Sequence, residues 1–279
     1  MAVTETTDPE RAVPDRDSGK EAPIVVEGVT MAFGDFVVQR DLNFRVEHGD
    51  IFIIMGGSGC GKSTVMRAMI GLQAPAEGRL LFEGQSLWEI GDIARQGLMR
   101  GAGVVFQSGG LWSSMTLAEN VSLPLGEYTD LNAKEIHEIA RLKLALVGLA
   151  GFEDFYPSQI SGGMQRRAGV ARALALDPKI LFFDEPSAGL DPISSERLDE
   201  LILQLRDSLG ATIIVVTHEL ASIFTIANNC VFLDAKSRTQ IATGNPLWLR
   251  DHSDNPSVRE FLNRGHVDSE QGQTADEES

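Results

Sequence analysis

A glycine-rich loop placed directly after an apolar segment constrains the fold of this chain more than any other feature. Residues 56–63 match the spacing G-x-x-x-x-G-K-[ST] of a phosphate-binding loop. The apolar run 51–55 precedes the loop, and a helical pattern begins near Ser63. In such a strand–loop–helix unit, backbone N–H groups and the helix N-terminus converge on anionic oxygens. We therefore predict a P-loop nucleotide-binding core, with phosphate contacts from Gly56, Gly57, Ser58, Gly59, Cys60, Gly61, Lys62, Ser63 and Thr64.

Two side chains of this loop have distinct expected tasks. Lys62 would reach the β and γ phosphates of a bound nucleotide, and the Ser63 hydroxyl would ligate Mg²⁺. The alternative is a glycine-rich turn that binds nothing. From average composition, the pattern arises by chance in about one in a hundred chains of this length. Because the strand and helix context lowers that figure further, we favour a nucleotide site.

Short, wholly apolar runs recur along the chain and indicate strands that are buried on both faces. A parallel sheet covered by helices produces this pattern. Between two of the runs, residues 198–209 carry an apolar stripe at helical spacing, and Gly210 is a natural residue to end that helix. We predict an α/β protein with a mostly parallel sheet, whose core strands contain residues 51–55, 104–106, 180–183, 213–216 and 231–233.

Two regions depart from this alternation of strands and helices. Residues 24–50 and 78–88 alternate apolar and polar side chains around glycines, which predicts an antiparallel β layer. Residues 111–165 look mostly helical, and Asn132 and Glu135 have the spacing of a capping box. We expect a helical insertion between two core strands, with a subdomain that spans about 108–168.

A second motif places two carboxylates at the end of a buried strand. Asp184 and Glu185 follow the apolar run 180–183, and the carboxyl ends of parallel strands border the crevice where such sheets bind ligands. Asp184 is then positioned to hold Mg²⁺ through its hydration shell, and Glu185 to polarise the attacking water. An ordinary acidic strand end is the alternative for this motif alone, but the phosphate loop makes it improbable.

A third motif, Ile-Ser-Gly-Gly-Met at 160–164, opens a predicted helix. With it, the chain resembles the ATP-binding subunits of ABC transporters over residues 24–245. The resemblance implies the ABC ATPase fold, hydrolysis of ATP and Mg²⁺ as a cofactor. Six elements occur in the order of that family: a Walker A loop at 56–64, a Q-loop at Gln107, the signature at 160–164, Walker B at 180–185, a D-loop at Asp191 and a switch residue at His218.

The resemblance also implies that the working form is a homodimer. In this family each ATP lies between the Walker loops of one subunit and the signature of the other. Ser161, Gly162 and Gly163 would therefore contact the γ-phosphate held by the partner, and Asp191 would span the dimer interface. The signature ends in Met164 where the family has Gln. Because backbone groups and Ser161 make most of the phosphate contacts, we expect activity to survive this change.

Three further residues receive roles from the resemblance. Gln107 would sense Mg²⁺ and the attacking water, and would link the nucleotide to whatever docks on the helical insertion. His218 would contact the γ-phosphate and hold Glu185 with its water. Phe33 would stack on the adenine in place of the family's usual Tyr. The alternatives are a structural or solvated histidine at 218 and simple core packing for Phe33.

A finer resemblance concerns the transported molecule. The chain is similar to the ATPase of Mla-type phospholipid-trafficking systems, which work with MCE-domain proteins, at 105–112, 114–116, 119–125, 189–193 and 258–262. This implies a separate permease dimer in a bacterial inner membrane and an MCE-domain lipid-binding protein in the same complex. The ATPase would sit peripherally on the cytoplasmic face of that membrane.

Two other function classes stay open. The ATPase of a polar-substrate importer, for example for amino acids, shares every catalytic motif, and the permease that co-purifies would distinguish it. The other class is a non-transport ABC ATPase that acts on ribosomes or DNA. Such proteins usually have two ATPase domains, long coiled coils or zinc-binding cysteines. This sequence has a single set of motifs and only two cysteines, Cys60 and Cys230.

Composition sets further limits on partners and compartment. A net charge of −16 without a basic stripe argues against a nucleic-acid partner. Two distant cysteines fit a reducing cytoplasm. Apolar runs are only of strand length, which excludes a membrane span in this sequence.

The two ends of the chain differ from the ABC domain, which we place at 23–245. Residues 1–22 and the acidic segment 266–279 lack apolar periodicity and are predicted to be disordered tails. Residues 246–265 are predicted to form a helical extension. This extension either covers its own domain or packs on the neighbouring subunit.

Overall fold

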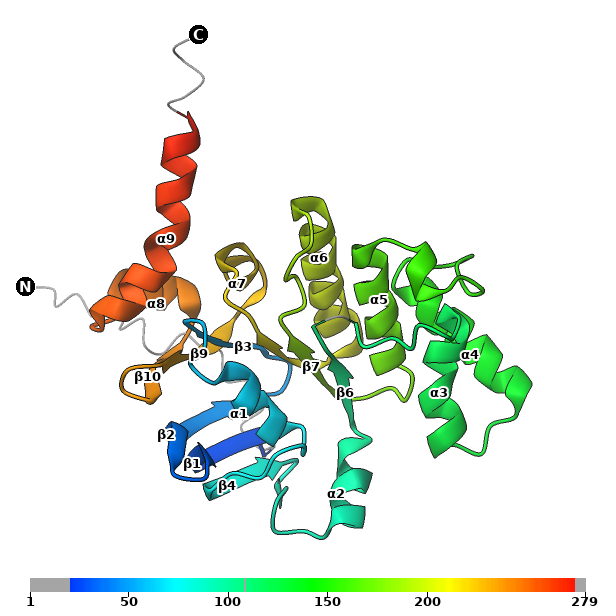
Figure 1. Cartoon of the computed structure of the whole chain (residues 1–279), viewed down its shortest axis with the longest axis horizontal. Helices are drawn as coiled ribbons and strands as arrows, with labels where there is room; N and C mark the ends of the chain where they lie inside the picture. The colour runs from blue at the N-terminus through cyan, green and yellow to red at the C-terminus, as the bar shows by residue number, and fades with distance from the viewer. Residues whose placement is uncertain (1–20, 108, 274–279) are drawn as a thin grey trace, which may run out of the picture.

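The computed structural model describes residues 21–107 and 109–273, with side chains up to residue 264. Two sheets organise this part of the chain (Figure 1). The first is antiparallel and confirms the predicted β layer. Its strands run in the order β2 (Phe36–Val46), β1 (Ile24–Phe33), β4 (Glu77–Phe82) and β5 (Gln85–Ser86).

The second sheet has the strand order β10-β9-β3-β8-β7-β6 and is parallel from β9 to β6. Within this second sheet, as far as the structure describes it, only β10 joins its neighbour, β9, in the antiparallel sense. The predicted core strands are confirmed, except that the sheet pairing ends at Val105 and leaves Phe106 partly exposed at the start of a loop. Their bounds are β3 (Ile51–Gly56), β6 (Ala102–Val105), β7 (Ile180–Asp184), β8 (Thr212–Val216), β9 (Asn229–Asp234) and β10 (Thr239–Gly244).

Both faces of this sheet are covered, as its wholly apolar strands predict. In β3, Phe52 and Ile54 pack in a core cluster with the antiparallel sheet and α1 (Lys62–Met69). Ile51 and Ile53 face the opposite cluster, which contains α6 (Pro192–Leu209) and α7 (Leu220–Ile226). Helix α6 ends at Gly210 in the left-handed conformation, as predicted.

The helical insertion lies between β6 and β7 in sequence and to one side of the sheet in space (Figure 1). Asn132 Oδ1 accepts the Glu135 N–H, and Glu135 Oε2 accepts the Asn132 N–H, which confirms the capping box. The insertion contains α3 (Leu117–Tyr128), α4 (Ala133–Leu146), a 3₁₀ helix (Pro157–Gln159) and α5 (Gly162–Ala173); α2 (Asp92–Met99) precedes β6.

The C-terminal extension covers its own domain. Leu249 of α8 (Pro246–His252), with Val258 and Leu262 of α9, is buried in the larger core cluster, and Figure 1 shows α9 projecting from there beyond the body. Helix α9 spans Pro256–Gln273, so it continues past residue 266, where we expected a tail. No proline interrupts that segment, and each residue added to a formed helix gains a hydrogen bond.

The predicted tails are otherwise beyond what the structure describes. Residues 1–20 and 274–279 lie outside the described residues, whereas Ala22, which we assigned to the N-terminal tail, is fully buried. None of the described helices combines the length and the apolar character needed to cross a bilayer.

A buried carboxyl between α6 and α7 gives a pH prediction. Asp199 Oδ2 accepts the Ser222 hydroxyl at 2.8 Å, and burial raises the pKa of Asp199 from 3.8 to about 6. The folded state then binds the proton more tightly than the unfolded state, so stability falls as pH rises from about 4 to about 6. We expect Asp199→Asn to remove this fall and to raise the free energy of unfolding near pH 8 by about 1–3 kcal/mol, measured by urea denaturation. A pH dependence equal to that of the wild type would contradict it.

Candidate functional site

Backbone geometry explains two of the glycines in the phosphate loop. Strand β3 ends at Gly56 with φ +146°, and a Cβ there would lie 2.2 Å from the Leu233 carbonyl oxygen. Gly61 precedes α1 with φ +98°, and a Cβ there would lie 2.5 Å from Val38 Cγ1. A side chain at either position would clash in a backbone conformation that only glycine adopts freely. The loop therefore passes tightly over the end of β9 and over β2.

Lys62 is held inside this loop. Its side chain is buried, and Nζ donates to the carbonyl oxygens of Gly56 at 3.0 Å and Gly57 at 3.2 Å. The same ammonium lies 4.0 Å from Glu185 Oε1. The loop thus carries a buried positive charge, which favours an anionic ligand.

Ser63 and Asp184 bring two oxygens together from different elements. Ser63 Oγ, in the first turn of α1, donates to Asp184 Oδ1 at the end of β7 at 3.0 Å. No cluster of three or more His, Cys, Asp or Glu side chains suited to a metal occurs among the described residues. The hydroxyl of Ser63 and the carboxylate of Asp184 are oxygen donors of the kind that suits Mg²⁺, which binds through one or two protein oxygens together with substrate phosphates and water.

Glu185 and His218 are directly joined. His218 Nδ1 lies 3.0 Å from both carboxylate oxygens of Glu185. The Glu185 N–H donates to the Val216 carbonyl at 2.8 Å, and its φ of +47° is unusual for a residue with a side chain. Such a backbone costs on the order of 1 kcal/mol and is typical of functional sites. It aims the carboxylate at the loop rather than along the strand.

The structure gathers most of the predicted site residues around one cavity of about 530 Å³. Phe33 is 54% exposed there, which excludes core packing as its role within this chain. The cavity can hold a phosphate chain over the loop and an aromatic base at its rim. Its lining includes Phe33, Ser58, Gly59, Gly61, Lys62, Ser63, Thr64, Gln107, Glu185 and His218.

Two further side chains line this cavity, Phe36 and Val38, and neither was predicted as a site residue. Phe36 pairs directly with Phe33 across the β1–β2 hairpin, and the Arg238 guanidinium lies 4.8 Å from the centre of its ring. The signal was present in the sequence, because the two-residue turn Gly34-Asp35 places its flanking residues side by side.

The predicted signature residues lie in a different place. Ser161 and Gly163 line a separate cavity of about 130 Å³, together with Arg167 and Arg197. Ser161 Oγ accepts the Met164 N–H at 3.3 Å and so caps α5. Within one chain, the two turns that were expected to grip the same phosphate chain do not share a cavity.

Asp191 is exposed at the start of α6 and caps that helix. Its Oδ1 accepts the Ser194 N–H at 3.0 Å. Hydrogen bonds from Ser194 hold the pKa of Asp191 below its ordinary value. The carboxylate is therefore fixed and ionised on the surface that leads from β7 to α6.

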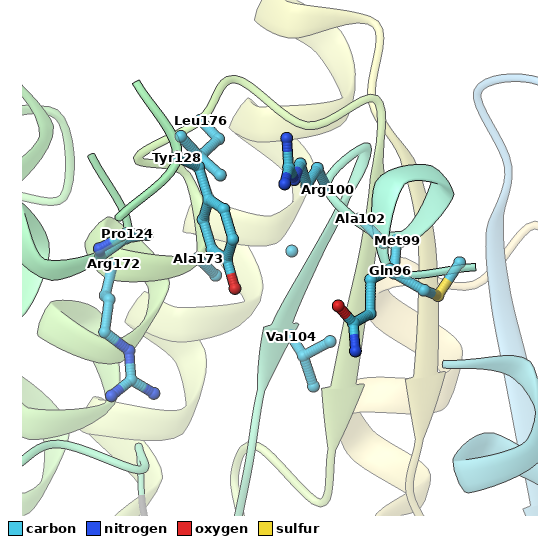
Figure 2. A pocket seen from close by; sticks show the side chains of 11 residues that line it. Gln96, Met99, Arg100, Ala102, Val104, Pro124, Tyr128, Arg172, Ala173 and Leu176 are labelled. Atoms are coloured by element: carbon cyan, nitrogen blue, oxygen red, sulfur yellow. The ribbon is translucent and has the colours of Figure 1, made fainter. Parts of the chain in front are cut away.

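A groove lies apart from both of these cavities, between the helical insertion and the rest of the molecule (Figure 2). It has a volume of about 300 Å³, and Tyr128 of α3 and Gln96 of α2 lie on opposite sides of it. The Arg100 guanidinium lies 4.8 Å from the centre of the Tyr128 ring. The other lining residues are Met99, Ala102, Gly103, Val104, Pro124, Arg172, Ala173 and Leu176.

Comparison with known proteins gives a consistent result. The ABC transporter family matches residues 39–188. The "Probable ribonucleotide transport ATP-binding protein mkl" of Mycobacterium tuberculosis is 39% identical over 240 residues, 86% of this chain and 66% of that protein, so the chain spans about two thirds of that relative. The "Intermembrane phospholipid transport system ATP-binding protein MlaF" of Escherichia coli K12 is 38% identical over 234 residues, 84% of this chain and 86% of that protein.

Solved structures agree with the sequence matches. The dimeric structure of MJ0796, described as a bacterial ABC transporter cassette, superposes with a TM-score of 0.73 at 29% identity, over 80% of this chain and 98% of that one. A second MJ0796 dimer, bound to ADP and Pi, gives a TM-score of 0.72 over the same fractions. The cbiO1 structure from Clostridium perfringens gives 0.76 at 26% identity, over 90% of this chain and all of that one.

Proposed function

Because this chain belongs to the ABC transporter family and is an ATPase of that family, we propose that it powers phospholipid movement between membranes through a separate permease. The observation that carries the proposal is its 38% identity to a protein named for intermembrane phospholipid transport, over 86% of that protein. The Mla-like segments of the sequence support the same assignment. An MCE-domain lipid-binding protein completes the proposed complex, with the ATPase on the cytoplasmic face of the inner membrane.

The proposed chemistry follows from the geometry of the cavity. Backbone N–H groups of the loop and Lys62 bind the β and γ phosphates, while Ser63 and Asp184 would hold Mg²⁺, which would neutralise phosphate charge. Glu185 accepts a proton from the attacking water, and His218 keeps the carboxylate in place from 3.0 Å. Gln107, which lines the same cavity, would contact Mg²⁺ and the attacking water. Catalysis is then mostly positioning and charge stabilisation.

A second copy of the chain completes each ATP site in this proposal. Ser161, Gly162 and Gly163 of one copy close over the phosphates bound by the other, and Asp191 lies at the contact between them. The separation of the two cavities within one chain supports this arrangement, as do the dimeric structures of similar cassettes.

We place the permease contact at the groove between α2, β6, α3 and α5. The groove lies against the helical insertion. The chain leaves β6 at Val105, passes Gln107 two residues later and then enters the insertion, so one segment connects the nucleotide site with the groove. Most of its lining residues are apolar, and it presents the half-exposed ring of Tyr128. An apolar groove of this kind fits a short helix of a membrane partner.

Tyr128→Arg is expected to reduce recovery of the permease in affinity purification by at least tenfold, since it places a charge where an apolar face must dock. The side chain is 49% exposed, so the substitution leaves the core intact. Leu142→Arg, on an α4 residue that is 66% exposed, is the matched control and should retain the permease. Equal recovery with Tyr128→Arg and with the wild type would move the contact elsewhere.

The names of two relatives point to different substrates, and the test of function has to distinguish between them. The mkl name favours ribonucleotides, whereas the MlaF name favours phospholipid. The complex purified with its permease and reconstituted in vesicles should transfer a fluorescent phospholipid to acceptor vesicles only with hydrolysable ATP. Uptake of a radiolabelled ribonucleotide, without lipid transfer, would favour ribonucleotide transport instead.

A further inference from the structure

A buried glutamine lies directly beneath the phosphate loop. Gln39 of β2 is fully buried, and its Nε2 donates to the Cys60 carbonyl at 2.7 Å and to the Asp234 carbonyl at 3.1 Å. One side-chain amide thus joins the antiparallel sheet, the phosphate loop and the end of β9. Its Oε1 is also buried and has no hydrogen-bond partner among the described residues. A buried acceptor without a partner is destabilising, so packing alone does not explain a glutamine at this position.

The bond to Cys60 determines the direction of the next N–H group. A trans peptide is planar, and its C=O and N–H point in opposite directions. Because Gln39 holds the Cys60 oxygen toward β2, the Gly61 N–H must point away from β2 and into the loop. The flanking residues do not impose this orientation, because Gly59 and Gly61 both adopt positive φ values, +74° and +98°, and glycine permits several others.

Other contacts make β2 and β9 a firm support for this bond. Asp234 Oδ2 accepts the N–H groups of Lys236 and Ser237, which fixes the β9–β10 turn. The Arg40 N–H donates to the Arg238 carbonyl at 2.8 Å. Gln39 therefore donates from β2, which is held in place, and its amide is oriented by the carbonyl at the end of β9. The Cys60–Gly61 peptide lies between these two elements.

We propose that Gln39 is a positioning residue for nucleotide binding: it holds the Cys60–Gly61 peptide so that the Gly61 N–H faces the phosphate chain. The proposal rests on the assignment of residues 56–63 as the phosphate loop. Gln39 itself does not touch the nucleotide. Its removal weakens the binding of the phosphate chain in the ground state and in the transition state alike, so the loss falls on KM rather than on kcat.

Gln39→Met tests this, because methionine has a similar length and volume but no donor. ATP affinity, measured by displacement of a fluorescent nucleotide, should fall on the order of tenfold, the equivalent of one lost hydrogen bond to a charged group. The KM for ATP should rise by the same factor, and kcat at saturating ATP should change less than about threefold. Inorganic tripolyphosphate, used as a competitor without a base or ribose, should lose affinity by a similar factor.

Gln240→Met is the matched control. The Gln240 side chain also bridges β10 to β2, through Asn43 at 2.8 Å and 2.5 Å, but it does not touch the loop. It should leave ATP and tripolyphosphate affinity within about twofold of the wild type. Equal losses in both variants would show that loosening of β2, rather than peptide orientation, is responsible, and would overturn the proposal.

Two further results separate this proposal from the site assignment. If Lys62→Ala abolishes ATP binding but a folded Gln39→Met variant binds ATP like the wild type, the phosphate loop stands and the role of Gln39 fails. If Gln39→Met does not fold, NMR of the wild-type protein decides. The Gln39 side-chain NH₂ signals should resist exchange with solvent with and without ATP, and rapid exchange would overturn the proposal.

Discussion

Replacing Glu185 with Gln is expected to slow ATP turnover on the order of 10³-fold, because a general base contributes about 10²–10⁴ to a rate. Glutamine keeps the size of the side chain and can still bond His218, but it cannot accept a proton from water. ATP binding should remain, since the loop, Lys62 and Ser63 are unchanged. The variant should therefore accumulate as an ATP-bound dimer, measured by phosphate release and by size-exclusion chromatography with ATP.

Glu219→Gln is the control for this prediction. Glu219 is a carboxylate that directly follows His218 in the sequence, and the variant removes its charge. That charge acts on Asp199 rather than on the phosphate loop. Turnover by this variant should stay within about threefold of the wild type. Hydrolysis by Glu185→Gln at the wild-type rate would remove Glu185 as the base and would leave its bond to His218 without a catalytic purpose.

The features that sequence predicted best are those governed by local chemistry. Glycine is needed at 56 and 61 because the backbone has a positive φ there. The run 51–55 is apolar because it is buried on both faces of a sheet. Asn132 and Gly210 mark helix ends through hydrogen bonds and φ values within a few residues. Each signal is complete in a short window of sequence, so the P-loop core and the helical insertion were predictable without coordinates.

Contacts between distant segments were not predictable in this way. Gln39 reaches Asp234 across 195 residues of sequence, and only the assembled sheets bring the two together. The groove is likewise built from separate helices around Tyr128 and Gln96. The left-handed backbone of Glu185 had no local signal either, because no glycine marks it. These features depend on packing, whereas the motifs depend on residue type.

Mixing two inactive variants is expected to restore an ATP site. Lys62→Ala alone should lose ATP affinity by about 100-fold, since hydrogen bonds to charged groups contribute roughly 1.5–3 kcal/mol. Ser161→Arg alone should bind ATP but fail to close over the partner's phosphates. A mixed dimer contains one site with both lesions and one site with neither. It should therefore form in the presence of ATP, whereas each variant alone should stay monomeric.

Differently tagged copies in a Glu185→Gln background make this measurable, because hydrolysis no longer reopens the dimer. ATP should allow one tag to recover the other only when the two variants are mixed, and two differently tagged Lys62→Ala copies should not recover each other. The result discriminates sharply, since a site contained within one chain predicts no rescue by mixing. If both variants fold and the mixture shows no ATP-dependent pairing, the cavity around Lys62 and the cavity around Ser161 do not serve one triphosphate.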